Sequence, residues 1–157
     1  MEIRRPTEKE AQSLSELISS VIKKVPYYSP KSKKEEIATQ TPEKISWRLK
    51  NSKSSFYLIS KEGGKVAGFL FGYLSTGLVH IGWVGVDKNY RRQGVAVQLI
   101  KEVEKFASKN KAHKIWLDTR INNKESIGLF KKLKYKKAAT FKKHYWGFDF
   151  FIWEKLL

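Results

Sequence analysis

The spacing of apolar residues along this chain changes several times, and the order of these changes restricts the fold more than any other feature. Apolar residues recur at helical spacing from Leu14 to Ile22, whereas residues 56–86 form short apolar segments that Gly-containing turns separate. Helical spacing returns after Gly94, and residues 114–154 then alternate between strand and helix patterns. Early hairpins followed by a strand–helix–strand crossover predict a mixed sheet covered by helices, an α/β (α+β) fold.

Capping residues and prolines indicate where the helices begin. Thr7 and Glu10 form a capping-box pattern, and Thr41-Pro42 is a cap followed by proline at the first helical position. The segment with Pro26 and Pro30 is expected to be a break, because proline cannot continue a helix. The expected helices cover residues 8–23, 42–50, 94–106 and 124–133, and the expected strands cover residues 2–5, 56–60, 66–74, 78–86, 114–120, 135–141 and 148–154.

Composition removes several classes of protein. The chain has 157 residues without a repeat or a flexible linker, so residues 1–157 are expected to form a single domain. It has no Cys and three His, which excludes disulfide scaffolds, thiolate metal sites and cysteine nucleophiles, and no metal site is expected. No apolar run approaches the roughly 20 residues that cross a bilayer, and no signal-peptide pattern precedes Pro6. A soluble, cytoplasmic protein without a membrane partner is expected.

The chain is strongly basic, with 32 Lys and Arg against 15 Asp and Glu and a formal net charge of +17. Such a charge attracts polyanions, of which nucleic acid and a multiply phosphorylated cofactor are the two candidates. The lysines are spread along the whole chain, so an ordinary solvated surface is an equal alternative. No nucleic-acid-binding motif is present.

The segment from Val84 to Ala96 carries the most chemical information. It joins the end of an expected strand to a turn with Arg91 and Arg92, and Gly94 stands where a helix begins. Amide groups at a helix start lack partners and lie at the positive end of the helix dipole, so they suit a phosphate. Gly94 would let a phosphate approach the backbone. The alternative is an exposed basic turn before a helix.

Two sequence blocks resemble one known family. The run Arg91–Ala96 (RRQGVA) resembles the (Gln/Arg)-x-x-Gly-x-(Gly/Ala) signature of the GNAT family of N-acetyltransferases. The run Asn123–Tyr135 (NKESIGLFKKLKY) is similar to that family's Asn-x-x-Ala-Ile-x-Leu-Tyr-x-Lys-Leu-Gly-Phe segment. Both blocks lie where the expected elements place them, so the resemblance covers nearly the whole chain. It implies the GNAT fold: a mostly antiparallel sheet of six to seven strands, about four flanking helices, and splayed strands at the cofactor site.

The resemblance also implies acetyl-CoA-dependent transfer of an acetyl group to an amine, by direct attack on the thioester. Strand residues would bind the pantetheine arm and polarise the thioester carbonyl, the helix start would hold the diphosphate, and the second block would complete the site. The implied cofactor-binding residues are Val84, Gly85, Val86, Arg91, Arg92, Gln93, Gly94, Val95, Ala96, Asn123, Ser126, Phe130 and Lys132. For Lys132, a solvated helix lysine is an equal alternative.

The second block departs from the family pattern at two positions. Phe130 stands where the family commonly has a tyrosine that protonates the leaving thiolate, and phenylalanine has no proton to donate. Lys134 replaces the usual glycine, which predicts a less demanding turn there. The first departure leaves the general acid in doubt, and the second is expected to have no functional effect.

Two residues compete for the role of general base, which must deprotonate the acceptor amine. His80 matches the base position of the histone-acetylating branch of the family, and imidazole suits the task. Asp118 matches the base of the branch that acetylates ribosomal-protein amino termini, but an ordinary carboxylate is a weak base. The alternatives are a histidine bonded to a neighbouring residue and an aspartate paired with Arg120. His80 is favoured narrowly.

The family resemblance implies that the acceptor enters near the closing hairpin, so aromatic residues there and in the proline-bounded loop after the first helix are the candidate acceptor-binding residues. They are Tyr27, Tyr28, His144, Tyr145 and Trp146. Ordinary core packing is the alternative for the residues of the hairpin. A protein or peptide amine, N-terminal or lysine, is the favoured acceptor, because a cationic protein repels a small polycation, although a local acidic pocket would defeat this argument. The alternatives are a polyamine or other small amine, a basic nucleic-acid-binding module, and a CoA-binding module without strong catalysis. The sequence does not indicate the oligomeric state.

Overall fold

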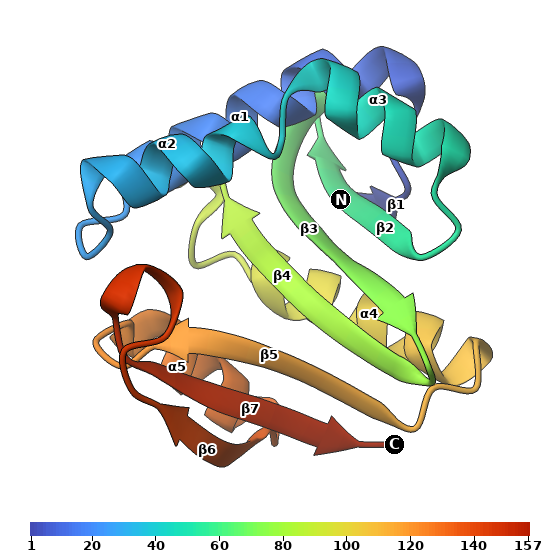
Figure 1. Cartoon of the computed structure of the whole chain (residues 1–157). Coiled ribbons are helices and arrows are strands. Elements are labelled where there is room, and N and C mark those ends of the chain that lie inside the picture. The colour runs from blue at the N-terminus through green and yellow to red at the C-terminus, as the bar shows by residue number, and fades with distance from the viewer.

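The computed structural model describes residues 1–157 and contains one seven-stranded sheet and five α-helices (Figure 1). The strands are β1 (Glu2–Arg4), β2 (Ser55–Glu62), β3 (Lys65–Ser75), β4 (Leu78–Val86), β5 (Lys114–Arg120), β6 (Lys136–Phe141) and β7 (Phe150–Leu156). The helices are α1 (Ala11–Lys23), α2 (Pro30–Ala38), α3 (Pro42–Asn51), α4 (Val95–Lys109) and α5 (Lys124–Lys132). None of these helices is both long and apolar enough to cross a membrane.

The sheet has the spatial order β1-β2-β3-β4-β5-β7-β6. Every neighbouring pair is antiparallel except β4 and β5, which run parallel because α4 connects them as a crossover helix. This arrangement confirms the predicted mixed, mostly antiparallel sheet of the GNAT fold.

The helices differ from the prediction in number, because α2 was not expected. A helix begins at Ser29-Pro30, where the sequence pattern predicts a break: the Ser29 side chain accepts a hydrogen bond from the Ser32 amide, and Pro30 is the first helical residue. Proline is well tolerated at that position, since its missing N–H would have no partner there. Thr41-Pro42 begins α3 in the same way, as expected. The first predicted helix starts with a short 3-10 turn, Glu8–Glu10, before α1.

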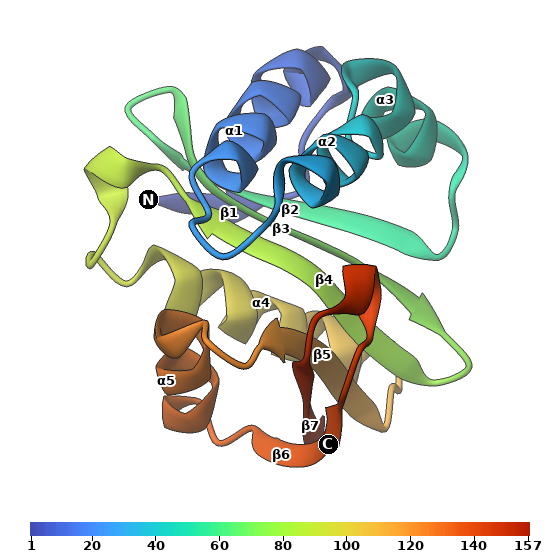
Figure 2. The same ribbon diagram turned by 60° about the vertical axis from the view of Figure 1, so that its left-hand side comes forward.

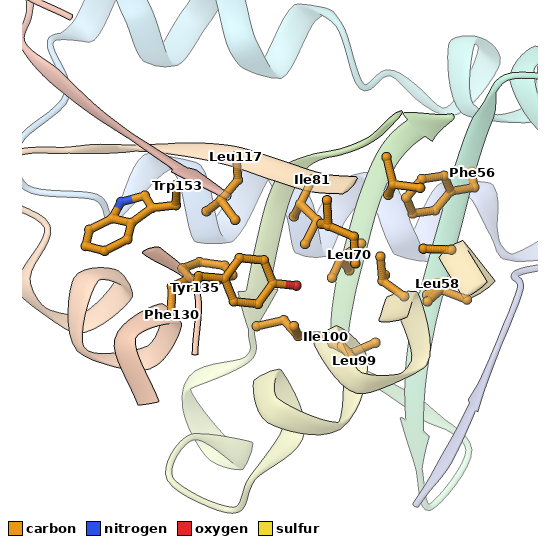
Figure 3. Close-up of a cluster of buried hydrophobic side chains, with 14 of the residues drawn as sticks. Phe56, Leu58, Leu70, Ile81, Leu99, Ile100, Leu117, Phe130, Tyr135 and Trp153 are labelled. Carbon is orange, nitrogen blue, oxygen red and sulfur yellow. The ribbon is translucent and has the colours of Figure 1, made fainter. Parts of the chain in front are cut away.

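Helices cover both faces of the sheet, and the alternation of side chains along β2 shows how. Phe56 and Leu58 face α4 in one buried cluster, which extends to Phe130 of α5 and is drawn in Figure 3. Tyr57 and Ile59 face α1 and α3 in a second buried cluster. Successive strand residues point to opposite faces, so β2 is buried on both sides. The sheet therefore separates an α1–α3 face from an α4–α5 face (Figure 2).

Strands β4 and β5 separate after a short paired region. Pairing begins at Leu78 and Lys114 and ends at His80 and Trp116, and the remainder of each strand has no partner across the gap (Figure 1). The register of β4 on β3 shifts so that Gly82 is an extra residue opposite Phe71 and Gly72. Such a bulge bends and twists its strand, and here it directly follows the last pair. The predicted splayed strands are therefore present.

The turn after α5 corrects one expectation. Lys134 has φ +68°, the left-handed conformation that glycine adopts most easily, so the turn is as demanding as the family's glycine would suggest. The Tyr135 amide donates to the Phe130 carbonyl and closes the helix end at 2.9 Å. The turn therefore keeps the left-handed backbone conformation, although lysine stands in place of the family's glycine.

Replacing Lys134 with glycine should stabilise the protein. A non-glycine residue in the left-handed region carries a penalty of about 1 kcal/mol, so we expect Lys134→Gly to raise the free energy of unfolding by about that amount. Urea denaturation would measure the change. Lys131→Gly, in the last turn of α5, is the control and should lower the same quantity, because glycine has a low helix propensity. A loss of stability in Lys134→Gly would contradict this interpretation.

Candidate active site

A cavity of about 1200 Å³ occupies the gap between β4 and β5 and opens toward both faces of the sheet. Its lining includes the start of α4 and most of α5 from one face, and α2 with the β6–β7 loop from the other. All of the predicted site residues line it except Gln93 and His144. The Gln93 amide group donates to the Asn89 carbonyl, and the His144 ring packs among Phe141, Tyr145 and Phe150.

The start of α4 offers unpaired backbone amides to this cavity. Gly94 is the N-cap residue with φ +81°, and the first hydrogen bond of the helix runs from the Gln98 amide to the Gly94 carbonyl. The amides of Val95, Ala96 and Val97 therefore have no partner within the helix. A Cβ added to Gly94 would meet no atom within 4 Å, so the glycine is required by its conformation and leaves open space beside the amides. These features fit a diphosphate.

The second half of β4 presents a free backbone edge to the gap. Val84, Gly85 and Val86 pair with β3 on one side and have no pairing with β5 on the other. Arg91 Nε donates to the Val86 carbonyl at 3.3 Å, which ties the basic turn back to this strand. An extended ligand lying in the gap would therefore find both strand hydrogen-bonding groups and the basic turn within the same cavity.

The predicted site residues at α5 differ in their surroundings: some are hydrogen-bonded or packed within the protein, and one is exposed to solvent. The Asn123 side chain caps α5, since its Oδ1 accepts from the Ser126 amide at 3.1 Å and its Nδ2 donates to the Ser126 hydroxyl at 2.8 Å. Phe130 is buried and packs against Tyr135 with ring centroids 5.2 Å apart. Lys132 is exposed at the cavity rim. Phe130 supplies an apolar wall, and Lys132 is free to reach an anion.

His80 and Asp118 meet at the point where the strands part. His80 is the last paired residue of β4, and its Nε2 lies 3.8 Å from Asp118 Oδ2. Both side chains are mostly buried, and His80 Nε2 has no hydrogen-bond partner. The His80 ring packs on Trp116 with centroids 4.1 Å apart. Asp118 pairs with His80 and forms no ion pair with Arg120, so the two candidate bases are neighbours in the structure.

Arg120 is a site residue that sequence reasoning treated only as a partner for Asp118. It is 8% exposed, its Nη1 donates to the Tyr27 carbonyl at 2.6 Å, and its guanidinium lies 3.7 Å from the Phe148 ring centroid. It therefore connects β5 to the α1–α2 loop and to the β6–β7 loop. The sequence signal for Arg120 is its spacing: it stands two residues after Asp118 in a strand, so both side chains lie on the same face of β5.

Glu36 is the second residue that was missed, because α2 was missed. It lines the cavity from α2. Burial raises the pKa of the Glu36 carboxyl, and the negative charge of Asp118 adds to this effect, while the Trp83 side chain opposes it. The cavity therefore contains two carboxylates on the α1–α3 face.

Aromatic side chains form the walls around these carboxylates. Tyr28 packs against Trp83 and Trp146, with ring centroids 5.7 and 6.0 Å away. The Trp146 indole donates a hydrogen bond to Glu35 of α2, so the β6–β7 loop and α2 are joined beside the cavity. Burial raises the pKa of Tyr27 to about 12, so this phenol is a neutral hydrogen-bonding group at physiological pH.

The cavity thus has one side at α4 and α5, which we name the donor side, and another under α2, which we name the acceptor side, joined through the gap between the strands. The sequence pattern of the Acetyltransferase (GNAT) family matches residues 22–135, which is more than half of the chain. The chain belongs to this family.

Solved structures share the whole fold at low sequence identity. The PaiA N-acetyltransferase of Thermoplasma acidophilum, solved with coenzyme A, is 20% identical, with a TM-score of 0.86 over 99% of this chain and 98% of that one. A ribosomal-protein-alanine N-acetyltransferase of Brucella melitensis is 17% identical, with a TM-score of 0.75 over 100% of both chains. An N-alpha-acetyltransferase of Saccharolobus solfataricus is 31% identical over 67 residues, which are 42% of this chain and 40% of that protein.

Family membership confirms the predicted class of enzyme, an acyltransferase of the N-acetyltransferase type with acetyl-CoA as donor. The structure contains no group of three or more His, Asp or Glu side chains placed to hold a metal ion.

Proposed function

We propose that this enzyme transfers an acetyl group from acetyl-CoA to a primary amine, with His80 and Asp118 together removing the proton from that amine. The observation that carries the proposal is the position of this pair: it lies 3.8 Å apart, mostly buried, where β4 and β5 separate and the two sides of the cavity meet. His80 is the proton acceptor, and Asp118 holds the imidazolium that forms.

The donor side would bind acetyl-CoA in an extended conformation. The amides of Val95 to Val97 and the side chains of Arg91 and Arg92 would hold the diphosphate, with the glycine at position 94 leaving room for it. The free edge of Val84–Val86 would bind the pantetheine arm and polarise the thioester carbonyl. Gln93, which lies outside the cavity, is assigned a structural role in the turn instead.

The chemical step needs only a base on the protein. The neutral amine attacks the thioester carbonyl, a C–N bond forms, the C–S bond breaks, and the amine proton passes to His80. Phe130 offers no proton to the departing thiolate, and the Tyr135 hydroxyl behind it lies outside the cavity lining. CoA therefore leaves as a thiolate and takes its proton from solvent.

Two kinds of acceptor fit the family. A protein or peptide amine is supported by the names of two similar proteins, an N-alpha-acetyltransferase and a ribosomal-protein-alanine N-acetyltransferase. A small amine is supported by the carboxylates of Glu36 and Asp118 in the cavity, because they counter the repulsion that a net charge of +17 exerts on a small cation. The site chemistry favours the small amine.

An acceptor panel tests the proposed activity directly. The protein is incubated with acetyl-CoA and with peptides that have free amino termini, a lysine peptide, and aliphatic mono-, di- and polyamines. We expect free thiol to appear together with a product 42 Da heavier than one of these amines. Calorimetric binding of CoA without thiol release for any amine would instead favour a CoA-binding module. Binding to nucleic acid that weakens steeply with salt and ignores acetyl-CoA would favour the basic module.

A further inference from the structure

The carboxylates of the acceptor side have no cationic partner from the protein. The ion pairs of the structure that involve Lys, Arg or the amino terminus use other carboxylates, and Asp118 pairs only with His80. Glu36 is in no ion pair, although its neighbour Glu35 pairs with Lys31. In a chain with 32 Lys and Arg against 15 Asp and Glu, two carboxylates that face one cavity without a Lys or Arg partner indicate a cationic ligand.

The walls of the acceptor side are suited to the same kind of ligand. Tyr28, Trp83 and Trp146 are neighbours around Glu36, and aromatic faces attract ammonium groups. Arg120 lies near one of these rings, since its guanidinium is 5.7 Å from the Tyr28 centroid while it donates to the Tyr27 carbonyl and stacks on Phe148. No Lys or Arg lies over the rings of Trp83 and Trp146. An organic cation would therefore meet both carboxylate charge and aromatic surface.

One ammonium group cannot satisfy both carboxylates through the reaction. The amine that attacks the thioester must be neutral, so it loses its charge beside His80 and Asp118. A charge that stays through the reaction must belong to a second amino group. We propose that Glu36 binds this second ammonium group, and that the acceptor is a small aliphatic diamine or polyamine. This inference rests on the proposed function and assigns Glu36 as a specificity-determining residue.

The connection between α2 and the β6–β7 loop favours a small acceptor over a polypeptide. The Trp146 indole donates to Glu35, and the Trp146 ring contacts Tyr28, so the two segments are joined beside the cavity. A peptide has to continue out of the site in an extended form, whereas an aliphatic diamine ends inside it. The contact between α2 and the β6–β7 loop therefore favours a small amine over a peptide as the acceptor.

A matched pair of amines tests the role of Glu36. 1,4-Diaminobutane and butylamine share the chain length and differ in the second amino group. We expect the wild-type kcat/KM to be about 10- to 100-fold higher for the diamine, the range expected for a hydrogen bond to a charged group. Glu36→Gln should reduce this ratio to near one, with the larger loss of kcat/KM for the diamine. Glu35→Gln is the control, because its amide oxygen still accepts from Trp146, and it should keep the wild-type ratio.

Three kinetic outcomes would overturn the inference. An equal loss for both amines in Glu36→Gln would mean that the residue acts through folding or catalysis. No preference for the diamine in the wild type, or a stronger preference for an N-terminal or lysine peptide, would reject the small diamine as substrate. Calorimetric binding of 1,4-diaminobutane to the CoA complex, strong in the wild type and lost in Glu36→Gln, would support the site even without transfer. Absence of transfer to every amine would contradict the proposed function instead.

Discussion

A Gly94→Asp variant should bind CoA about 100-fold more weakly than the wild type while remaining folded. The new carboxylate would lie at the start of α4, beside the amides that we assign to the diphosphate, and like charges a few ångströms apart repel by several kcal/mol in a partly buried site. Aspartate tolerates the left-handed conformation better than most residues and is a good helix N-cap, so the fold should persist. Calorimetric titration with CoA measures the change.

Two controls separate charge from conformation in this experiment. Gly94→Asn has nearly the same shape and conformational preference without the charge, and it should lose far less affinity than the aspartate variant. Gly64→Asp places the same residue at φ +79° in the β2–β3 turn, outside the cavity lining, and should leave CoA affinity unchanged. Equal CoA affinity in Gly94→Asp and the wild type would remove the diphosphate from this helix start.

A His80→Gln variant should lower kcat by about 100-fold, the lower end of what a general base contributes. Glutamine has similar size, so the packing on Trp116 should persist, but its amide cannot accept the amine proton. CoA affinity should stay near the wild-type value, because His80 is not among the groups that we propose to hold CoA. The rise of the rate with pH should also become flatter. Steady-state kinetics over a pH series, with calorimetry for CoA, measures all three quantities.

Variants of Asp118, the partner of His80, and of His113, a distant histidine, are the controls for His80→Gln. Asp118→Asn should also lower kcat, by a smaller factor, because it leaves the imidazole in place without the carboxylate that stabilises its charged form. His113→Gln changes an exposed histidine before β5 and should leave kcat within about twofold. Unchanged turnover in His80→Gln would exclude His80 as the base and leave Asp118 or a bound water in that role.

The missed helix α2 shows where the sequence pattern was too weak to decide the structure. Its sequence, PKSKKEEIA, contains little apolar material, so no helical spacing is visible. The start signal at Ser29-Pro30 is of the same kind as Thr41-Pro42, but Pro26 shortly before it suggested a break. Contact with α1 holds the helix in place. Glu36 was missed for this reason, since a residue in an expected loop has no predictable direction.

The sequence by itself determined the local features of this protein: the order of strands and helices, the glycine and arginines at the start of α4, and the two blocks that indicate the family. These depend on interactions between residues close in the chain, which spacing and residue type record directly. Tertiary structure alone decided that β4 and β5 part after His80, that Asp118 meets it there, and that Glu36 faces the same cavity. Such placements depend on strand register, a bulge at Gly82 and the packing of α2, which the whole chain sets together.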